Sequence, residues 1–139
     1  MKDLMNSIDV KRVISPVSVA DNTAQVGQVV DGRGASSVTY LIAAGSIADA
    51  DATFAVLLEE CDTSGGTYTA VADADMIGTE ALAGFQFDDD NECRKLGYKG
   101  AKRYTKLTIT PANNASAALV AAVCVLGHQM VAPTANPPA

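Results

Sequence analysis

The sharpest chemical group in this chain is an acidic run at residues 88–92, Asp-Asp-Asp-Asn-Glu. Hard cations such as Ca²⁺ need several carboxylate oxygens that converge on one point. A calcium-binding loop alternates its ligands and places a glycine at the sharp turn, whereas this run is contiguous, so its successive side chains diverge. The pattern favours a solvated acidic loop, and it leaves open whether Asp88 to Glu92 bind a cation.

Side chains suited to catalysis are scarce. His128 is the only histidine, and a lone histidine without an evident Ser or Cys partner usually packs or forms hydrogen bonds. Cys124 lies in an apolar run, which raises the pKa of a thiol and makes it unreactive. With Cys61 and Cys93 it forms no Cys-x-x-Cys clip, and an odd number of cysteines fits a reducing cytoplasm without a structural disulfide. We therefore predict a protein that is not an enzyme, with no catalytic residue, no metal and no cofactor.

Charge is distributed unevenly along the chain. Residues 1–92 contain all 16 acidic side chains and four basic ones, whereas residues 93–139 contain six basic side chains and no acidic one. The whole chain has a net charge of −6, which repels phosphate at long range, so we expect no nucleic-acid partner. Two interpretations of the basic segment remain. Its strands could pair beside acidic strands, or it could form part of a bipolar surface that docks on another protein.

The basic segment begins with an aromatic and cationic motif at residues 97–104, Gly-Tyr-Lys-Gly-Ala-Lys-Arg-Tyr. Two glycines interrupt it directly before a strong strand pattern, which predicts a bend that presents its large side chains at the surface. Tyrosine and arginine are enriched where proteins bind partners. The candidate partner-binding residues are Tyr98, Lys99, Lys102, Arg103 and Tyr104. The alternative is a cationic strand edge that blocks unwanted sheet pairing.

Period-two alternation of apolar residues predicts a series of short strands and almost no helix. A Gly-Gly turn joins two of them into a hairpin, and Pro111 with the following asparagines is expected to end another in a turn. That strand is expected to pair with the next one, which is buried on both faces. The loop at residues 31–34, Asp-Gly-Arg-Gly, lacks the lysine and Ser/Thr of a phosphate-binding loop. The predicted strands are residues 10–19, 24–30, 37–43, 53–60, 67–72, 104–110 and 117–126, and only residues 73–83 could hold a helical turn.

This spacing of strands and turns is typical of an all-β protein, a jelly roll or β-sandwich of seven to eight antiparallel strands. We expect one domain at residues 10–130 with irregular N- and C-terminal arms at residues 1–9 and 131–139, because neither end has a clear period and the second contains three prolines. Such arms are suited to binding a neighbouring protein. The longest apolar stretch, residues 117–127, is too short to span a bilayer, so we expect no membrane partner.

Three stretches of the sequence are similar to those of a known class of proteins. They are TYTAVADADMIG, LGYKGAKRYTKLTITP, and AAVCVLGH followed by a proline-containing tail. They resemble small β proteins encoded in the head-gene modules of tailed bacteriophages, over roughly residues 50–133. In length and β content the chain is similar to capsid decoration (cement) proteins of the jelly-roll type, such as that of a short-tailed Bordetella phage. The resemblance implies a virion structural protein on the capsid exterior, made in the host cytoplasm. Its implied partners are the major capsid protein and further copies of itself, as a dimer or higher oligomer.

Two other functions stay open at this stage. A head–tail or tail structural component would form a ring of few copies, whereas a decoration protein occurs in hundreds of copies per particle. A surface carbohydrate-binding β module is the other alternative, although such modules usually need aromatic platforms, and this chain is 5% aromatic without tryptophan.

Overall fold

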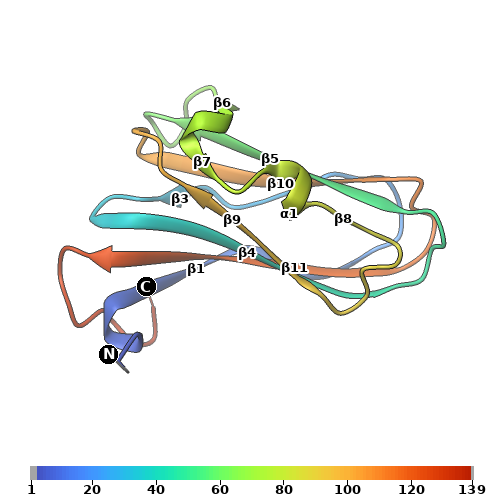
Figure 1. The fold of residues 1–139 in the computed structure, drawn as a ribbon, viewed down its shortest axis with the longest axis horizontal. Helices are drawn as coiled ribbons and strands as arrows, with labels where there is room; N and C mark the ends of the chain where they lie inside the picture. The colour runs from blue at the N-terminus through green and yellow to red at the C-terminus, as the bar shows by residue number, and fades with distance from the viewer. Residues whose placement is uncertain (1–2, 139) are drawn as a thin grey trace.

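Two antiparallel β-sheets pack face to face in a computed structural model that describes residues 3–138 (Figure 1). The predicted all-β sandwich is therefore confirmed. Eleven strands are present in this part of the chain, five of them only two residues long, so the count exceeds the predicted seven to eight. The strands are β1 Ile8–Val19, β2 Gln25–Val26, β3 Val30–Asp31, β4 Ala35–Ile47, β5 Thr53–Cys61, β6 Thr69–Ala70, β7 Met76–Ile77, β8 Phe85–Gln86, β9 Cys93–Tyr98, β10 Tyr104–Ala112 and β11 Ala118–Gln129. The helical turns are η1 Met5–Ser7, η2 Asp73–Asp75 and α1 Glu80–Ala83.

One sheet has the strand order β1-β11-β4-β9-β7. The other has the order β2-β10-β5-β6, with β3 also paired to β10 and β8 to β5. The long strands alternate in direction, so the loops gather at two opposite ends of the sandwich (Figure 1). One end carries both termini and the turns after β3 and β9. The other end carries the loops that follow β1, β4, β8 and β10.

The core lies between the sheets and follows the predicted alternation. In β4 the side chains of Val38, Tyr40 and Ile42 are buried, and in β5 so are those of Phe54 and Leu58. A strand whose apolar residues recur every second position buries one face and leaves the other toward solvent. A polar pair crosses this interior: the Tyr40 hydroxyl lies 2.7 Å from the Thr105 hydroxyl, which satisfies both groups.

The predicted pairing of residues 104–110 with residues 117–126 is wrong. Strand β10 pairs with β5, β2 and β3, whereas β11 lies in the other sheet between β1 and β4. The connection at residues 113–117 therefore crosses from sheet to sheet, which a local turn signal cannot distinguish from a hairpin. The expectation that β11 is buried on both faces is also wrong, because Leu119 on its outer face is 46% exposed.

Three further predictions about strands needed adjustment. Pro111 does not end its strand but pairs with Phe54 inside β10. On the other edge of β10, β2 pairs only with Thr108 and Ile109, so no backbone N–H is needed there at Pro111. The predicted strand at residues 24–30 is split into β2 and β3. The return strand at residues 67–72 pairs with β5 over two residues only. Strand β9 was not predicted, and only its last two residues, Gly97 and Tyr98, were interpreted, as part of a bend.

Gly27 lies between β2 and β3, where the backbone packs too closely for a side chain. Its amide donates to the Leu107 carbonyl at 2.8 Å, and a Cβ at this position would lie 2.5 Å from that same oxygen. We expect Gly27→Ala to lower the free energy of unfolding by about 1–3 kcal/mol, the range for overpacked sites. Gly65→Ala is the control, because a Cβ there meets nothing within 4 Å. Equal urea midpoints for the two variants would show that the backbone at Gly27 is free to move.

The two terminal arms lie against each other beside the sandwich (Figure 1). The Thr134 hydroxyl donates to the Ile8 carbonyl at 2.5 Å, and the Thr134 amide donates to the Asn6 carbonyl at 3.0 Å. Residues 8 and 9, which we assigned to the first arm, belong to β1 and pair with β11. The rest of that arm contains the short helix η1. No helix within residues 3–138 is long and apolar enough to cross a membrane.

Candidate functional site

A cleft opens at the end of the sandwich that also carries the termini. The antiparallel pairing of β4 with β9 brings the turn before β4 beside the loop after β9. The cleft between them has a volume of about 360 Å³. Four basic side chains line it: Arg33, Lys99, Lys102 and Arg103. We call this feature the cationic cleft.

Tyr98 forms part of the lining of the cationic cleft and is buried, not presented at the surface as predicted. Its hydroxyl donates to the Glu60 carboxylate at 2.5 Å and accepts the Lys102 amide at 2.9 Å. Burial and the neighbouring Glu60 raise the pKa of Tyr98 above its ordinary value, so it stays protonated. The tyrosine thus fixes the loop over the cleft. Gly100 is required there, because a Cβ would lie 2.5 Å from the Tyr98 hydroxyl.

Three of the basic side chains in or beside the cleft have acidic partners. Arg103 bonds Asp31 through two nitrogens, at 2.9 and 2.7 Å, and this bond lowers the pKa of Asp31. Lys102 lies 2.5 Å from Asp62. Lys106 lies 3.3 Å from Glu59, its direct cross-strand neighbour. The interpretation that basic strands pair beside acidic ones is therefore confirmed for Lys106 and Glu59, whereas Lys102 and Arg103 lie just before β10.

Arg33 and Lys99 differ from those three residues. Within residues 3–138 neither forms an ion pair, and both line the cleft. Lys99 is exposed as predicted, and Tyr104 is half-buried under the Arg103 guanidinium, 4.8 Å from its ring centre. Arg33 was missed by the sequence analysis. The pairing of β4 with β9 and that of β3 with β10 place it beside the predicted motif, and neither pairing was predicted.

The opposite end of the sandwich is acidic. Its four loops, at residues 20–24, 48–52, 87–92 and 113–117, contain seven acidic residues and no basic one. Several carboxylates hold these loops together: Asp90 accepts the Ile47 amide at 2.5 Å, and Asp49 accepts the Ala115 amide at 2.8 Å. These acidic residues therefore link the loops to each other as well as making this end of the protein hydrophilic.

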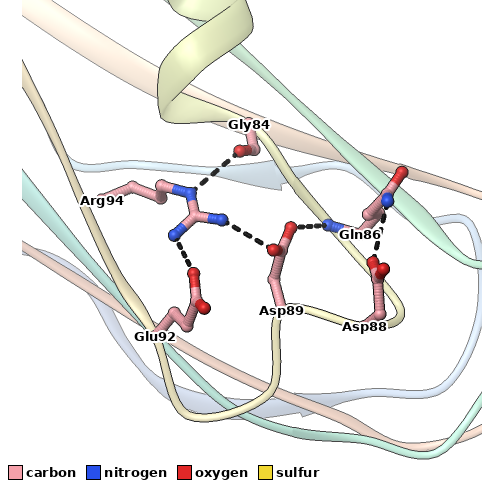
Figure 2. Close-up of polar contacts among 6 residues, drawn as sticks. All are labelled: Gly84, Gln86, Asp88, Asp89, Glu92 and Arg94. Atoms are coloured by element: carbon pink, nitrogen blue, oxygen red, sulfur yellow. Dashed lines mark hydrogen bonds and ion pairs between the residues drawn. The ribbon is translucent and has the colours of Figure 1, made fainter.

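The acidic run at residues 88–92 is organised by one arginine (Figure 2). Arg94 contacts Asp89 at 2.9 Å, bonds Glu92, and donates to the Gly84 carbonyl at 3.3 Å. Asp88 points instead to the Gln86 side chain, at 2.8 Å. The carboxylates therefore diverge toward separate partners. Among residues 3–138 no group of three or more potential ligands converges in a way that could hold a metal ion.

The candidate catalytic residues are separated in the structure. The thiol of Cys124 is buried between the sheets, which raises its pKa to about 12 and keeps it protonated, as predicted. His128 is exposed near the end of β11. All three cysteines are free.

Apolar side chains collect on the terminal arms. Four of the most exposed large hydrophobic residues lie there: Leu4 at 67%, Met5 at 61%, Met130 at 83% and Val131 at 78%. Exposed apolar groups that cluster in one place mark sites of association more often than isolated ones do. The arms are therefore the second candidate surface, adjacent to the cationic cleft at the same end of the sandwich.

Comparisons with known proteins place the fold. No family model and no curated protein matches the sequence. Among solved structures the chain is similar to the PBSX exported protein XepA, with a TM-score of 0.57 and 14% identity. That match covers 94% of this chain but 40% of XepA, so this chain spans less than half of that protein's length. At this identity the likeness shows a shared fold.

Two other matches are weaker. One is the CBM22-1–GH10 segment of the Clostridium thermocellum xylanase 10B, with a TM-score of 0.47 and 12% identity, over 95% of this chain and 28% of the other. The other is the SPBc2 prophage-derived protein YomS, with a TM-score of 0.44 and 12% identity, over 85% of this chain and 92% of the other.

Proposed function

We propose that this protein is a virion structural protein that binds the outer surface of an assembled tailed-phage capsid and cements neighbouring capsid subunits. It is a binding protein rather than an enzyme, and its partners are the major capsid protein and other copies of itself. The sequence resemblance to decoration proteins supports this proposal, and the sandwich fold is one that the PBSX exported protein XepA also has.

The observation that carries the proposal is the pair of terminal arms. They lie outside the sandwich, are held to each other by Thr134, and expose four large apolar side chains. A small protein gains nothing in its own stability from methionine and leucine side chains in solvent. The same side chains become stabilising when a partner surface covers them. An assembled shell offers such a surface between its subunits.

The cationic cleft gives the contact its orientation. It lies beside the arms on a protein with a net charge of −6, so it can attract a complementary acidic patch that the rest of the molecule repels. Electrostatic matching mainly sets the association rate and register, while buried apolar and aromatic anchors supply affinity. The two surfaces thus have separate roles.

We expect Lys99→Glu combined with Lys102→Glu to slow attachment to undecorated particles about tenfold at low salt, and to make the remaining binding less sensitive to salt. Occupancy measured against ionic strength checks this. Lys95→Glu is the matched control, because Lys95 is an exposed lysine on β9 outside the cleft. Wild-type kinetics in the double variant would remove the cleft from the contact.

Copy number tests the function itself. Densitometry of purified particles is expected to give hundreds of copies of this chain. A dozen or fewer copies per particle would contradict capsid decoration and indicate a head–tail or tail component. Retention on a polysaccharide column without particle binding would indicate a carbohydrate-binding module.

A further inference from the structure

We propose that copies of this chain associate head to tail, with the acidic end of one copy docked in the cationic cleft of the next. The acidic end is defined by the loops at residues 20–24, 48–52 and 87–92. This contact does not rest on the proposed function, because both surfaces belong to the free chain. Since Lys99 also belongs to the surface proposed to face the shell, a given cleft binds either the shell or the next copy.

One side of the contact is the acidic end, which has an excess of negative charge. Arg94 neutralises only Asp89 and Glu92. The remaining carboxylates at this end form no ion pair within residues 3–138. These are Asp21, Asp49, Asp51, Asp88 and Asp90. The crowding is direct between Asp49 and Asp51, where a hydrogen bond to Asp49 raises the pKa of Asp51. A cationic partner would relieve this repulsion.

The other side of the contact is the cleft, where two cations form no ion pair within residues 3–138. Both line the cleft, Arg33 from the turn before β4 and Lys99 from the loop after β9, so we expect a carboxylate that enters the cleft to contact both. An arginine can hold a carboxylate through two hydrogen bonds, which fixes its orientation. The volume of about 360 Å³ suits a few side chains at the tip of a loop rather than a folded element.

The acidic end also carries an apolar side chain that could anchor the contact. Phe87 directly precedes Asp88 and is 39% exposed. The cleft offers apolar surface from Val38 and Ala35 beside its charges. Charged groups would orient the loop, and the phenyl ring would bury area against the cleft wall.

Carboxylates fit the cleft better than phosphates do. Asp31, Glu60 and Asp62 surround the lining residues and already partner Arg103, Tyr98 and Lys102. A ligand with one negative charge per group suits the two remaining cations. A polyphosphate chain would meet these three carboxylates and the acidic body of the protein. The chain itself supplies the complementary carboxylates at its other end.

The placement of the two surfaces determines the kind of assembly. They lie at opposite ends of the sandwich (Figure 1), so one copy can use both at once. A contact between two different surfaces is heterologous, and it produces either a closed ring or an open chain of copies. It does not stop at a twofold dimer. On a shell, copies whose clefts hold a neighbour would attach through their terminal arms and be linked to each other across the surface.

Charge reversal at either end tests the inference. Sedimentation velocity of the wild-type chain at high concentration and low salt is expected to show species larger than a monomer, which salt disperses. Arg33→Glu with Lys99→Glu is expected to weaken this association at least about tenfold, and so is Asp51→Lys with Asp88→Lys. An equimolar mixture of the two double variants restores complementary ends, so it is expected to recover the larger species. Circular dichroism checks that each variant is folded.

Lys95→Glu serves as the control and is expected to associate like the wild type. A wild-type chain that stays monomeric at low salt, or a mixture that fails to recover association, would overturn the proposal. Particle attachment is measured separately. The acidic-end variant keeps the whole cleft, so its loss of self-association with normal attachment separates this contact from capsid binding. Failure of attachment with intact self-association would contradict only the proposed function.

Discussion

Phe54→Ala is expected to lower the free energy of unfolding by about 3–5 kcal/mol, the usual cost of removing a buried phenyl ring. Phe54 is 2% exposed and stacks on Phe85, with ring centres 4.6 Å apart and planes 8° apart. The stack attaches β8 to the start of β5. The loop at residues 87–92 follows β8 directly, so a cavity here loosens the acidic end as well as the core. Urea unfolding followed by circular dichroism measures the change.

Phe87→Ala provides the matched comparison for this prediction. It removes the same ring two residues after Phe85, from a position that is 39% exposed. We expect a change within about 0.5 kcal/mol, as for most surface substitutions. If both variants lost the same stability, the stack would not be what holds β8 to the sandwich.

The sandwich could be predicted from the sequence because its long strands alternate clearly. Val38, Tyr40 and Ile42 repeat at the period of a strand with one buried face, and the structure buries all three. The alternation does not say which strands pair. The turn after β10 has the residues of a hairpin turn, yet the chain crosses there to the other sheet. Pairing depends on contacts between distant residues, which no local pattern contains.

The same limit explains the partial success at the candidate site. Lys99, Lys102 and Arg103 were found because they are close in the sequence, and all three line the cleft. Tyr98 was also predicted, but as an exposed residue, whereas the structure buries it. Its position in β9 is fixed by pairing with Val38 and Met76, and the burial follows from that. Arg33 lies 66 positions before Lys99, so only the fold brings the two together.

The charge pattern was interpreted correctly in part. The local ion pairs of Arg103 and Lys106 are those expected when basic strands lie beside acidic ones. A composition cannot show that the loops with five of the ten acids that form no ion pair within residues 3–138 gather at one end. That arrangement follows from strand direction, because the loops after β1, β4, β8 and β10 all leave the sheets on the same side (Figure 1).

Removal of the C-terminal arm is expected to weaken attachment to particles by at least about 100-fold without unfolding the domain. Truncation after Gln129 deletes Met130 and Val131, the two most exposed large apolar side chains among the described residues. Burial of each against a shell would contribute about 1.5–3 kcal/mol, and the sum corresponds to the expected loss of affinity. Binding of labelled protein to undecorated particles measures the effect.

The domain itself should survive this truncation, because β11 ends at Gln129 and keeps its pairing with both β1 and β4. What is lost inside the chain is the hydrogen bonding of Thr134 to the first arm and the bond from the Met130 amide to the Gly34 carbonyl at 2.8 Å. Thr134→Val separates the two effects, since it unties the arms but leaves Met130 and Val131 in place. We expect this variant to bind more weakly than the wild type and more strongly than the truncated chain. Loss of the β-sheet circular dichroism signal on truncation would show that the arm belongs to the fold, and unchanged attachment would show that the shell does not cover it.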